Sequence, residues 1–142
     1  MTRTMQELSS TQCLDLLRSK QVGRLGVTAE NYPMIFVVNY GLDGDVVIVR
    51  TESGTKLSAA SHANVCFEVD EIDDDAQTGW SVLILALAEE VTDAHREEIA
   101  SRTQANAVQP WAPGERGRWL RLIPHRMTGR RIEGASGVTS QT

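Results

Sequence analysis

Short segments of alternating apolar and polar residues recur along most of the chain, and they constrain its fold more than any other feature. In one of them Val65, Phe67 and Val69 alternate with more polar neighbours. This period of two places successive side chains on opposite faces of a β-strand. We predict strands on this basis at residues 24–28, 34–40, 45–51, 64–71, 80–91, 118–124 and 127–132.

Turn-forming residues separate the predicted strands. Residues 29–32 predict a turn before Pro33, which suits the start of a strand, and residues 41–44, with two glycines, predict a hairpin. The acidic segment 73–79 lacks the ligand spacing and the closing glutamate of a calcium loop. We therefore interpret it as a solvated loop, and we predict no metal site.

Three helices are expected around these strands. Ser9, Ser10 and Thr11 offer hydroxyl N-caps for a short first helix, and Gly23 is expected to end it. A second short helix is predicted over 56–62, with Leu57 and Ala60 on its buried face. A third is predicted from Thr92 to about residue 106, with charges on one side and Ile99 on the other.

Many short strands with few helices predict an α+β domain built on a small antiparallel β-barrel with peripheral helices, in preference to a doubly wound sheet. No repeat or linker divides the chain, so we expect a single domain over residues 1–133. The segment 134–142 is small and polar, and we predict that it is a disordered tail.

Composition narrows the class of protein. The chain has 142 residues and a formal net charge of −5, which argues against a nucleic-acid binder or a protein of acidic membranes. The two cysteines, Cys13 and Cys66, stand in unrelated contexts and form no disulfide framework. The N-terminus lacks the apolar run of a signal peptide, and no segment reaches membrane-spanning length. A cytoplasmic location is expected.

Residues 50–57 combine hydroxyl groups, a glycine and two cations, Arg50 and Lys56, just after a strand that ends in Asn39 and Tyr40. A phosphate group is bound by hydrogen-bond donors, close backbone approach and positive charge. The sequence thus predicts a pocket for a phosphorylated cofactor across two strands. The alternative is a solvated hairpin end, in which Lys56 at a helix start opposes the helix dipole by about 0.3–1 kcal/mol.

Other chemistry-bearing residues have ordinary structural interpretations. The histidines are scattered, and no Ser-His-Asp order, metal cluster, Walker loop or G-x-G-x-x-G motif occurs. Cys66 is expected to be a buried, inert thiol because no base partner is visible. Asn39 could cap its own turn. Trp80, Trp111 and Trp119 would commonly anchor a core or an interface, and Trp119, on an alternating strand, is expected to be packing.

Taken together, several segments give the chain a family likeness. It resembles the pyridoxamine 5′-phosphate oxidase-like superfamily of FMN-binding split barrels, and most closely its short-chain, nitroimidazole-resistance-like branch. The resemblance covers roughly residues 8–132 and is carried by segments 22–27, 33–40, 50–57, 65–70, 78–82 and 128–132.

The resemblance implies a homodimer with two cofactor sites at its interface. Its implied cofactor-binding residues fall into three groups. The phosphate would contact Arg50, Thr51 and Lys56, with Thr55 as a further candidate. The isoalloxazine ring would lie along Val37, Val38 and Asn39. Trp80 and Ser81 would begin a strand that makes polar contacts to flavin. Among the tryptophans that could instead stack on the ring, Trp111, in a proline-bracketed loop, is the candidate for a lid.

The chain departs from the vitamin B6 oxidases in two places. Their strand corresponding to 34–39 carries cations that this chain lacks, and their long C-terminal substrate-binding segment has no counterpart here. Vitamin B6 oxidation is therefore not expected.

The implied function is an FMN-dependent oxidoreductase that acts on a small organic molecule by hydride transfer, with no catalytic residue assigned because the flavin carries the chemistry. The alternatives are an F420-dependent reductase, a non-catalytic protein that binds flavin, coenzyme F420 or haem, and a degenerate member with an empty pocket.

Overall fold

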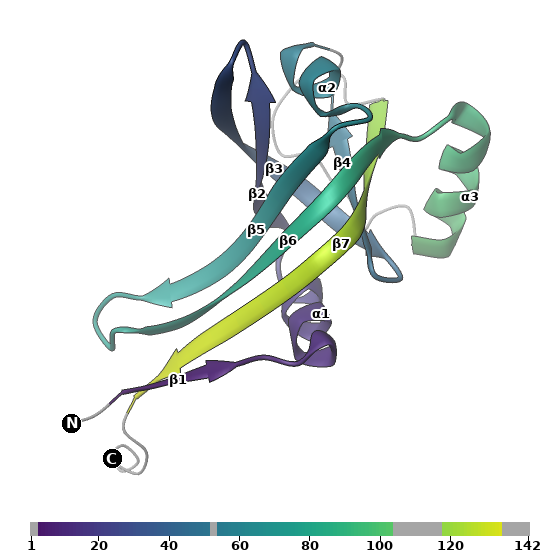
Figure 1. Ribbon diagram of the computed structural model, residues 1–142. Coiled ribbons are helices and arrows are strands. Elements are labelled where there is room, and N and C mark those ends of the chain that lie inside the picture. Colours follow the sequence, from purple (N-terminus) through teal and green to yellow (C-terminus); the bar gives the residue numbers. More distant parts are fainter. Residues whose placement is uncertain (1–2, 52–53, 104–117, 135–142) are drawn as a thin grey trace.

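The computed structural model describes residues 3–51, 54–103 and 118–134 (Figure 1). Its sheet order is β1-β7-β4-β3-β2-β5-β6, and a further pairing of β6 with β7 closes the sheet into a ring. Every strand pairing is antiparallel. The elements are β1 (Thr4–Glu7), α1 (Ser10–Arg18), β2 (Val22–Ala29), β3 (Tyr32–Asp43), β4 (Val46–Thr51), α2 (Thr55–Ala60), β5 (Asn64–Asp73), β6 (Thr78–Glu90), α3 (Asp93–Thr103) and β7 (Arg118–Glu133).

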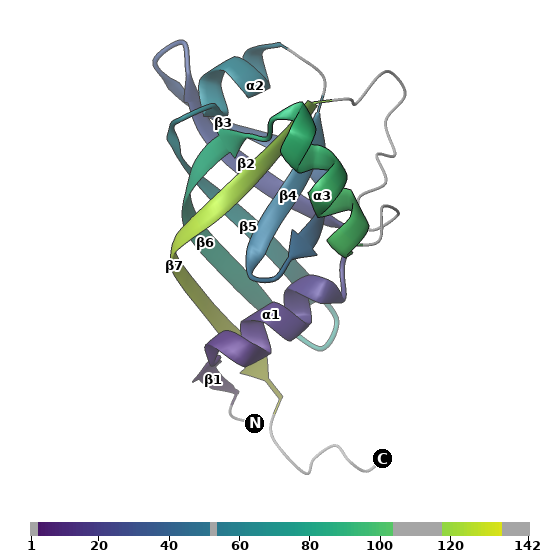
Figure 2. The same ribbon diagram turned by 90° about the vertical axis from the view of Figure 1, so that its right-hand side faces the viewer.

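This architecture confirms the predicted α+β split barrel. The helices lie at its periphery: α2 and α1 sit toward opposite ends of the barrel, and α3 lies beside β4 (Figure 2). The expected cap of α1 is also present. The Ser9 side chain accepts a hydrogen bond from the Gln12 backbone N–H while the Gln12 side chain binds the Ser9 backbone N–H, which is a capping box.

Three local expectations were wrong. The segments predicted as two strands, 118–124 and 127–132, form the single strand β7, whose pairing with β6 shifts by one residue around His125. A β-bulge there accommodates Pro124, which cannot donate to the ladder. Helix α1 ends at Arg18, so Gly23 does not end it but lies within β2. The strand β1 was not predicted, because all four of its residues are exposed and show no alternation.

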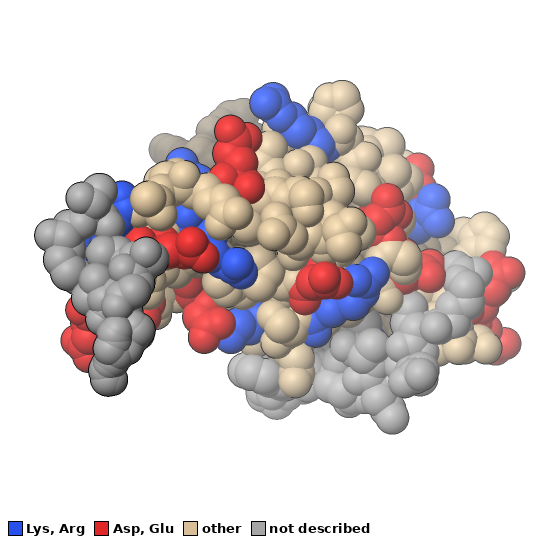
Figure 3. Space-filling model, turned by 90° about the horizontal axis from the view of Figure 1, so that it is seen from below, with Lys and Arg blue, Asp and Glu red and all other residues tan. Residues whose placement is uncertain are grey.

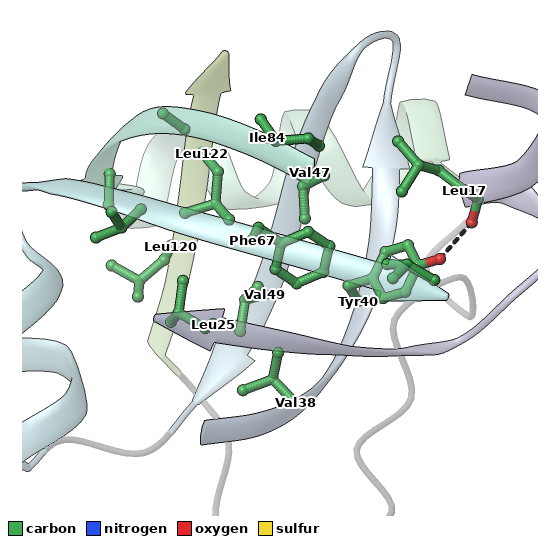
Figure 4. Packing of buried hydrophobic residues seen from close by; sticks show 14 of the residues in the cluster. Leu17, Leu25, Val38, Tyr40, Val47, Val49, Phe67, Ile84, Leu120 and Leu122 are labelled. Atoms are coloured by element: carbon green, nitrogen blue, oxygen red, sulfur yellow. Dashed lines mark hydrogen bonds between the residues drawn. The ribbon is translucent and has the colours of Figure 1, made fainter. Parts of the chain in front are cut away.

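The barrel interior explains why position 23 is a glycine. Tyr40 and Phe67 pack edge to face with ring centroids 5.1 Å apart, and a Cβ at Gly23 would lie 2.4 Å from the Phe67 ring. The Tyr40 hydroxyl donates a hydrogen bond to the Leu17 carbonyl of α1 (Figure 4). Burial raises the pKa of the Tyr40 phenol above its usual value. Tyr40 therefore joins α1 to the core.

A second, smaller cluster forms outside β4. Ile99 of α3 is buried against Ile48, Val91 and Trp119, which confirms both the predicted buried side of α3 and the packing role of Trp119. Helix α2 is one residue earlier at its start and two residues shorter at its end than predicted, and Ala60 is fully buried as expected. No helix in the described part of the chain is both long and apolar enough to cross a bilayer.

Candidate flavin site

Alternate residues of β3 face the barrel interior and the outside, and this divides the three predicted ring contacts. Val38 is 5% exposed and packs in the core, whereas Val37 is 68% exposed on the outer surface. Asn39 also lies on the outer side, half-buried, with Nδ2 donating to the Gln21 carbonyl at 3.3 Å. A planar ligand outside the barrel could meet the side chains of Val37 and Asn39 but only the backbone of Val38.

The end of β4 shows the same division. Tyr40 pairs with Val49, so Asn39 and Arg50, one residue further along each strand, stand across from each other. Arg50 points outward, with its guanidinium carbon 5.7 Å from the centroid of the Trp119 ring. Thr51 points inward and is 1% exposed. Arg50 is thus the predicted phosphate contact that the structure presents on the surface.

Helix α2 follows β4 directly and contains the other two predicted phosphate contacts. Thr55 and Lys56 are its first two residues, and their side chains lie outside the described part of the structure. The backbone around the helix is fixed by hydrogen bonds to β6, where the His62 N–H donates to the Ala88 carbonyl at 2.8 Å. The C-terminal end of α2 is thereby placed beside the part of β6 that carries Ala88.

Trp80 and Ser81 lie at the opposite end of β6. Trp80 is eight residues from Ala88, a distance of about 27 Å at about 3.4 Å per residue in a strand. The Trp80 side chain is largely buried on the inner face, whereas Ser81 points outward between Asp70 and Arg130. The structure therefore does not bring all the predicted site residues together in one chain. Trp111 lies outside the described residues.

A groove of about 410 Å³ opens beside Ser81 on the outer side of β6 and β7. An adjoining hollow of about 360 Å³ shares Met5, Ser81 and Arg130 with it. Arg130 makes no ion pair with any described residue, and its cross-strand neighbour is Ser81. Arg130 was not among the predicted site residues. Its position in the last strand is visible in the sequence, but only the pairing of β7 with β6 places it beside Ser81.

Between these two ends lies a surface that we call the outer apolar face. It consists of the exposed or half-exposed side chains of Ile35, Val37, Leu83, Leu85 and Leu87. The register joins Ile35 to Leu85 in one row through Gly26 and Cys66. In the next row Val37 and Leu83 are separated by Arg24 and Glu68. An apolar surface of this extent is typical of an interaction site.

Three charged residues lie within the outer apolar face. Nη1 of Arg24 lies 3.3 Å from Glu68 Oε1 and 3.3 Å from Asp70 Oδ2. The pKa of the Glu68 carboxyl is raised to about 7, chiefly by burial, then by hydrogen bonding to Asp70 and repulsion from it, while Arg24 opposes the shift. This arrangement favours a proton on Glu68 near neutral pH.

Two observations concern charged side chains outside the candidate site. Seen from below, acidic and basic side chains are interspersed without a continuous basic patch (Figure 3). The acidic residues 73–75 are exposed, as expected for a solvated loop, and no group of three or more potential ligands gathers among the described residues. Cys66, expected to be buried, is partly exposed because it lies on the outer face of β5, beside Gly26, where a Cβ would come within 2.5 Å of its sulfur.

Comparisons with known proteins agree with the family likeness. A family model for pyridoxamine 5′-phosphate oxidase matches residues 9–131. An uncharacterised protein of Mycobacterium tuberculosis is 32% identical over 136 residues, covering 92% of this chain and 87% of its own length.

Two solved structures extend this comparison. The FAD-binding protein of Mycobacterium smegmatis is 35% identical with a TM-score of 0.69, over 92% of this chain and 100% of that one. A Bacteroides thetaiotaomicron protein described in terms of 5-nitroimidazole antibiotic resistance has a TM-score of 0.73 over 93% of this chain and 90% of that one. At 12% identity, the second structure supports the fold alone.

Proposed function

We propose, because the chain belongs to the pyridoxamine 5′-phosphate oxidase family, that it is a homodimeric flavin-dependent oxidoreductase acting on a small organic molecule. The observation that carries the proposal is the division of the candidate site. Arg50 lies just before α2, beside the last residues of β6, whereas Ser81 and Arg130 face each other near its first residues. Val37 and Asn39 lie between them on the outer side of β3. Two copies packed through their outer apolar faces, in opposite directions, would bring one half of each site to the other.

The side chains of the candidate site suit the different parts of a flavin. Val37 and Leu83 offer apolar surface for the ring, and the Asn39 amide and Ser81 hydroxyl can hydrogen-bond its polar edge. Arg50 provides a cation for the phosphate. Thr55 and Lys56, the first two residues of α2, are its further proposed contacts. Arg130 is added as a contact from the second copy. The buried side chains of Val38 and Thr51 are assigned to holding the strands.

A bound flavin would supply the hydride chemistry, and the protein would bind and orient it and exclude water. Water is excluded from the flavin when a second copy covers the outer apolar face. No side chain is assigned an acid or base role, and the substrate is a small organic molecule that fits the interface cleft. We propose a cytoplasmic protein that acts on neither nucleic acid nor membranes.

The cofactor itself is FMN in our proposal, with FAD and coenzyme F420 as competitors. FAD enters because the M. smegmatis relative is described as an FAD-binding protein. FMN and FAD share the ring and the first phosphate, so the same contacts serve both. Titrating purified protein with FMN, FAD and F420 in parallel, followed by fluorescence and by calorimetry, separates them. Binding of none of the three would contradict the proposal.

A non-catalytic flavin-binding protein is the second candidate, favoured by the description of that same relative as a binding protein. Reduction of the bound flavin by a nicotinamide donor, followed by its reoxidation with small acceptors, distinguishes the two. Turnover supports the oxidoreductase. Tight binding with no faster reoxidation than free flavin supports the binding protein.

Mixed dimers test the divided site directly. Arg50→Ala and Arg130→Ala each weaken both sites of their own homodimer. A mixed dimer of the two variants contains one site with both changes and one site with neither. We expect co-expressed mixed dimers to bind flavin with wild-type affinity at half the stoichiometry. If both arginines served the same chain's site, no intact site would form and no high-affinity binding would return.

A further inference from the structure

The cluster of Arg24, Glu68 and Asp70 is unusual in its balance of charge. One guanidinium nitrogen lies 3.3 Å from an oxygen of each of two carboxylates, so with both ionised the cluster carries one net negative charge. It stands among apolar side chains, with Val37 opposite Arg24 and Leu83 opposite Glu68. Uncompensated charge in such surroundings is costly once water is removed.

Few other groups can compensate that charge. On β5 the described neighbours of Glu68 on the same face are the Cys66 thiol and Asp70, and on β6 they are Leu83 and Ser81. Beyond β6, strand β7 presents Arg126 and Arg130, opposite Leu85 and Ser81. These arginines are two strands away from Glu68 and make no ion pair with any described residue of their own chain.

We propose that the packing of two copies through the outer apolar face takes up a proton at the Arg24–Glu68–Asp70 cluster, so that the dimer and the flavin sites it completes become weaker as pH rises. The inference rests on the dimer of the proposed function and adds to it a regulation by pH. The occupant is a second copy, because Arg50 and α2 lie at one end of β6 while Ser81 and Arg130 lie at the other, so that a complete site requires two chains.

The physical reason is desolvation. A second copy removes water from both carboxylates, and a proton from solvent shared between Glu68 and Asp70 makes the cluster neutral. The pKa of Glu68 is already raised to about 7 in the single chain, so further burial moves its titration through the neutral range. Whenever association raises the pKa of a group, the associated state binds more protons, and a higher pH opposes association.

The test is the dimer dissociation constant of flavin-free protein, measured by analytical ultracentrifugation between about pH 6 and about pH 8. A rise of one pKa unit at two equivalent sites predicts weakening on the order of 10- to 100-fold across that range. Glu68→Gln keeps the shape and the neutral charge of the protonated residue. Its dissociation constant should stay near the wild-type low-pH value at every pH.

Two further variants provide a second test and a control. Asp70→Asn removes the second carboxylate and leaves Glu68 alone with Arg24, so its dimer should also lose most of the pH dependence. Glu71→Gln is the matched control, since Glu71 pairs with Lys20 at 3.0 Å and does not contact the cluster. That variant should retain the wild-type response.

A wild-type dimer whose dissociation constant is constant, or falls, as pH rises overturns the inference, and so does a Glu68→Gln dimer that still responds to pH. A pH-insensitive dimer that binds flavin overturns this inference alone. A chain that is monomeric throughout the pH range overturns both the inference and the dimer of the proposed function.

Discussion

Strands β2, β3, β5 and β6 carry apolar side chains on both faces, but in the described part of the chain only the inner face is covered. On the inner face, Phe67, Leu25 and Ile84 are almost completely buried. On the outer face of β3 and β6, Val37, Leu83 and Leu85 remain exposed or half-exposed. The inner face therefore accounts for the stability of one chain, and in our proposal the outer face is covered by a second copy.

The largest expected effect comes from the inner face. Phe67→Ala removes a fully buried ring that packs on Tyr40 and fills the space above Gly23. We expect a loss of about 3–5 kcal/mol in the free energy of unfolding. Urea denaturation followed by circular dichroism measures it. Leu83→Ala is the matched control on the outer face, and a comparable loss of monomer stability there would erase the distinction between the faces.

Substitutions on the outer apolar face should change the dimer dissociation constant and leave the folding of the monomer intact. Leu85→Asp places a carboxylate in the middle of the outer apolar face, and we expect dimerisation to weaken by at least about 2–3 kcal/mol, roughly 30- to 150-fold. Flavin affinity should fall with it, while the secondary structure of the monomer is retained. Gel filtration with light scattering checks this. Ala94→Asp, exposed on α3, is the control, and an unchanged Leu85→Asp dimer would place the interface elsewhere.

Tyr40 and Asn39 are neighbours on β3 whose side chains lie on opposite faces of the strand. The Tyr40 hydroxyl donates inward to the Leu17 carbonyl. Tyr40→Phe leaves that carbonyl without this bond, and we expect a loss of about 1–2 kcal/mol in unfolding free energy with unchanged flavin affinity. Denaturation and flavin titration of the same preparation decide the matter. Weaker flavin binding at unaltered stability would assign Tyr40 to the ligand.

The inner face was predictable from the sequence because it depends on local alternation. The period of two along residues 64–71 correctly places Val65, Phe67 and Val69 in the core. The same rule missed β1, whose four residues are all exposed. It also divided β7 in two, because Pro124 and the bulge beside it interrupt the pattern while the strand continues through its pairing with β6.

The candidate site was less accessible to sequence reasoning because it depends on which face each residue takes and on contacts between distant strands. The family resemblance implied that both Arg50 and Thr51 contact phosphate, yet the structure turns Arg50 outward and buries Thr51. Arg130 became a candidate only through its register opposite Ser81. The site is divided between the two ends of β6. This division depends on contacts between distant strands, so local sequence patterns do not predict it.

The smallest expected effect is the pH dependence of the unfolding free energy that Glu68 causes. It shows whether this carboxyl titrates in the folding of one chain as well as in its association. The pKa of Glu68 is raised from 4.5 to about 7 in the folded chain, so over that interval the folded state holds more protons than the unfolded state. The sign follows directly: the stabilising contribution is complete below the unfolded pKa and is lost as pH rises through the folded one. Unfolding free energy should therefore decline up to about pH 7 and then level off.

The monomeric Leu85→Asp variant is a suitable background, because dimerisation no longer contributes to its stability. Urea titrations at several pH values should show the decline there, and adding Glu68→Gln should remove it. If the decline persisted in the double variant, another group would be responsible. If it were absent from the Leu85→Asp monomer but present in the wild type, the carboxyl would titrate only at the interface, and the charge cluster would act in association and not in folding.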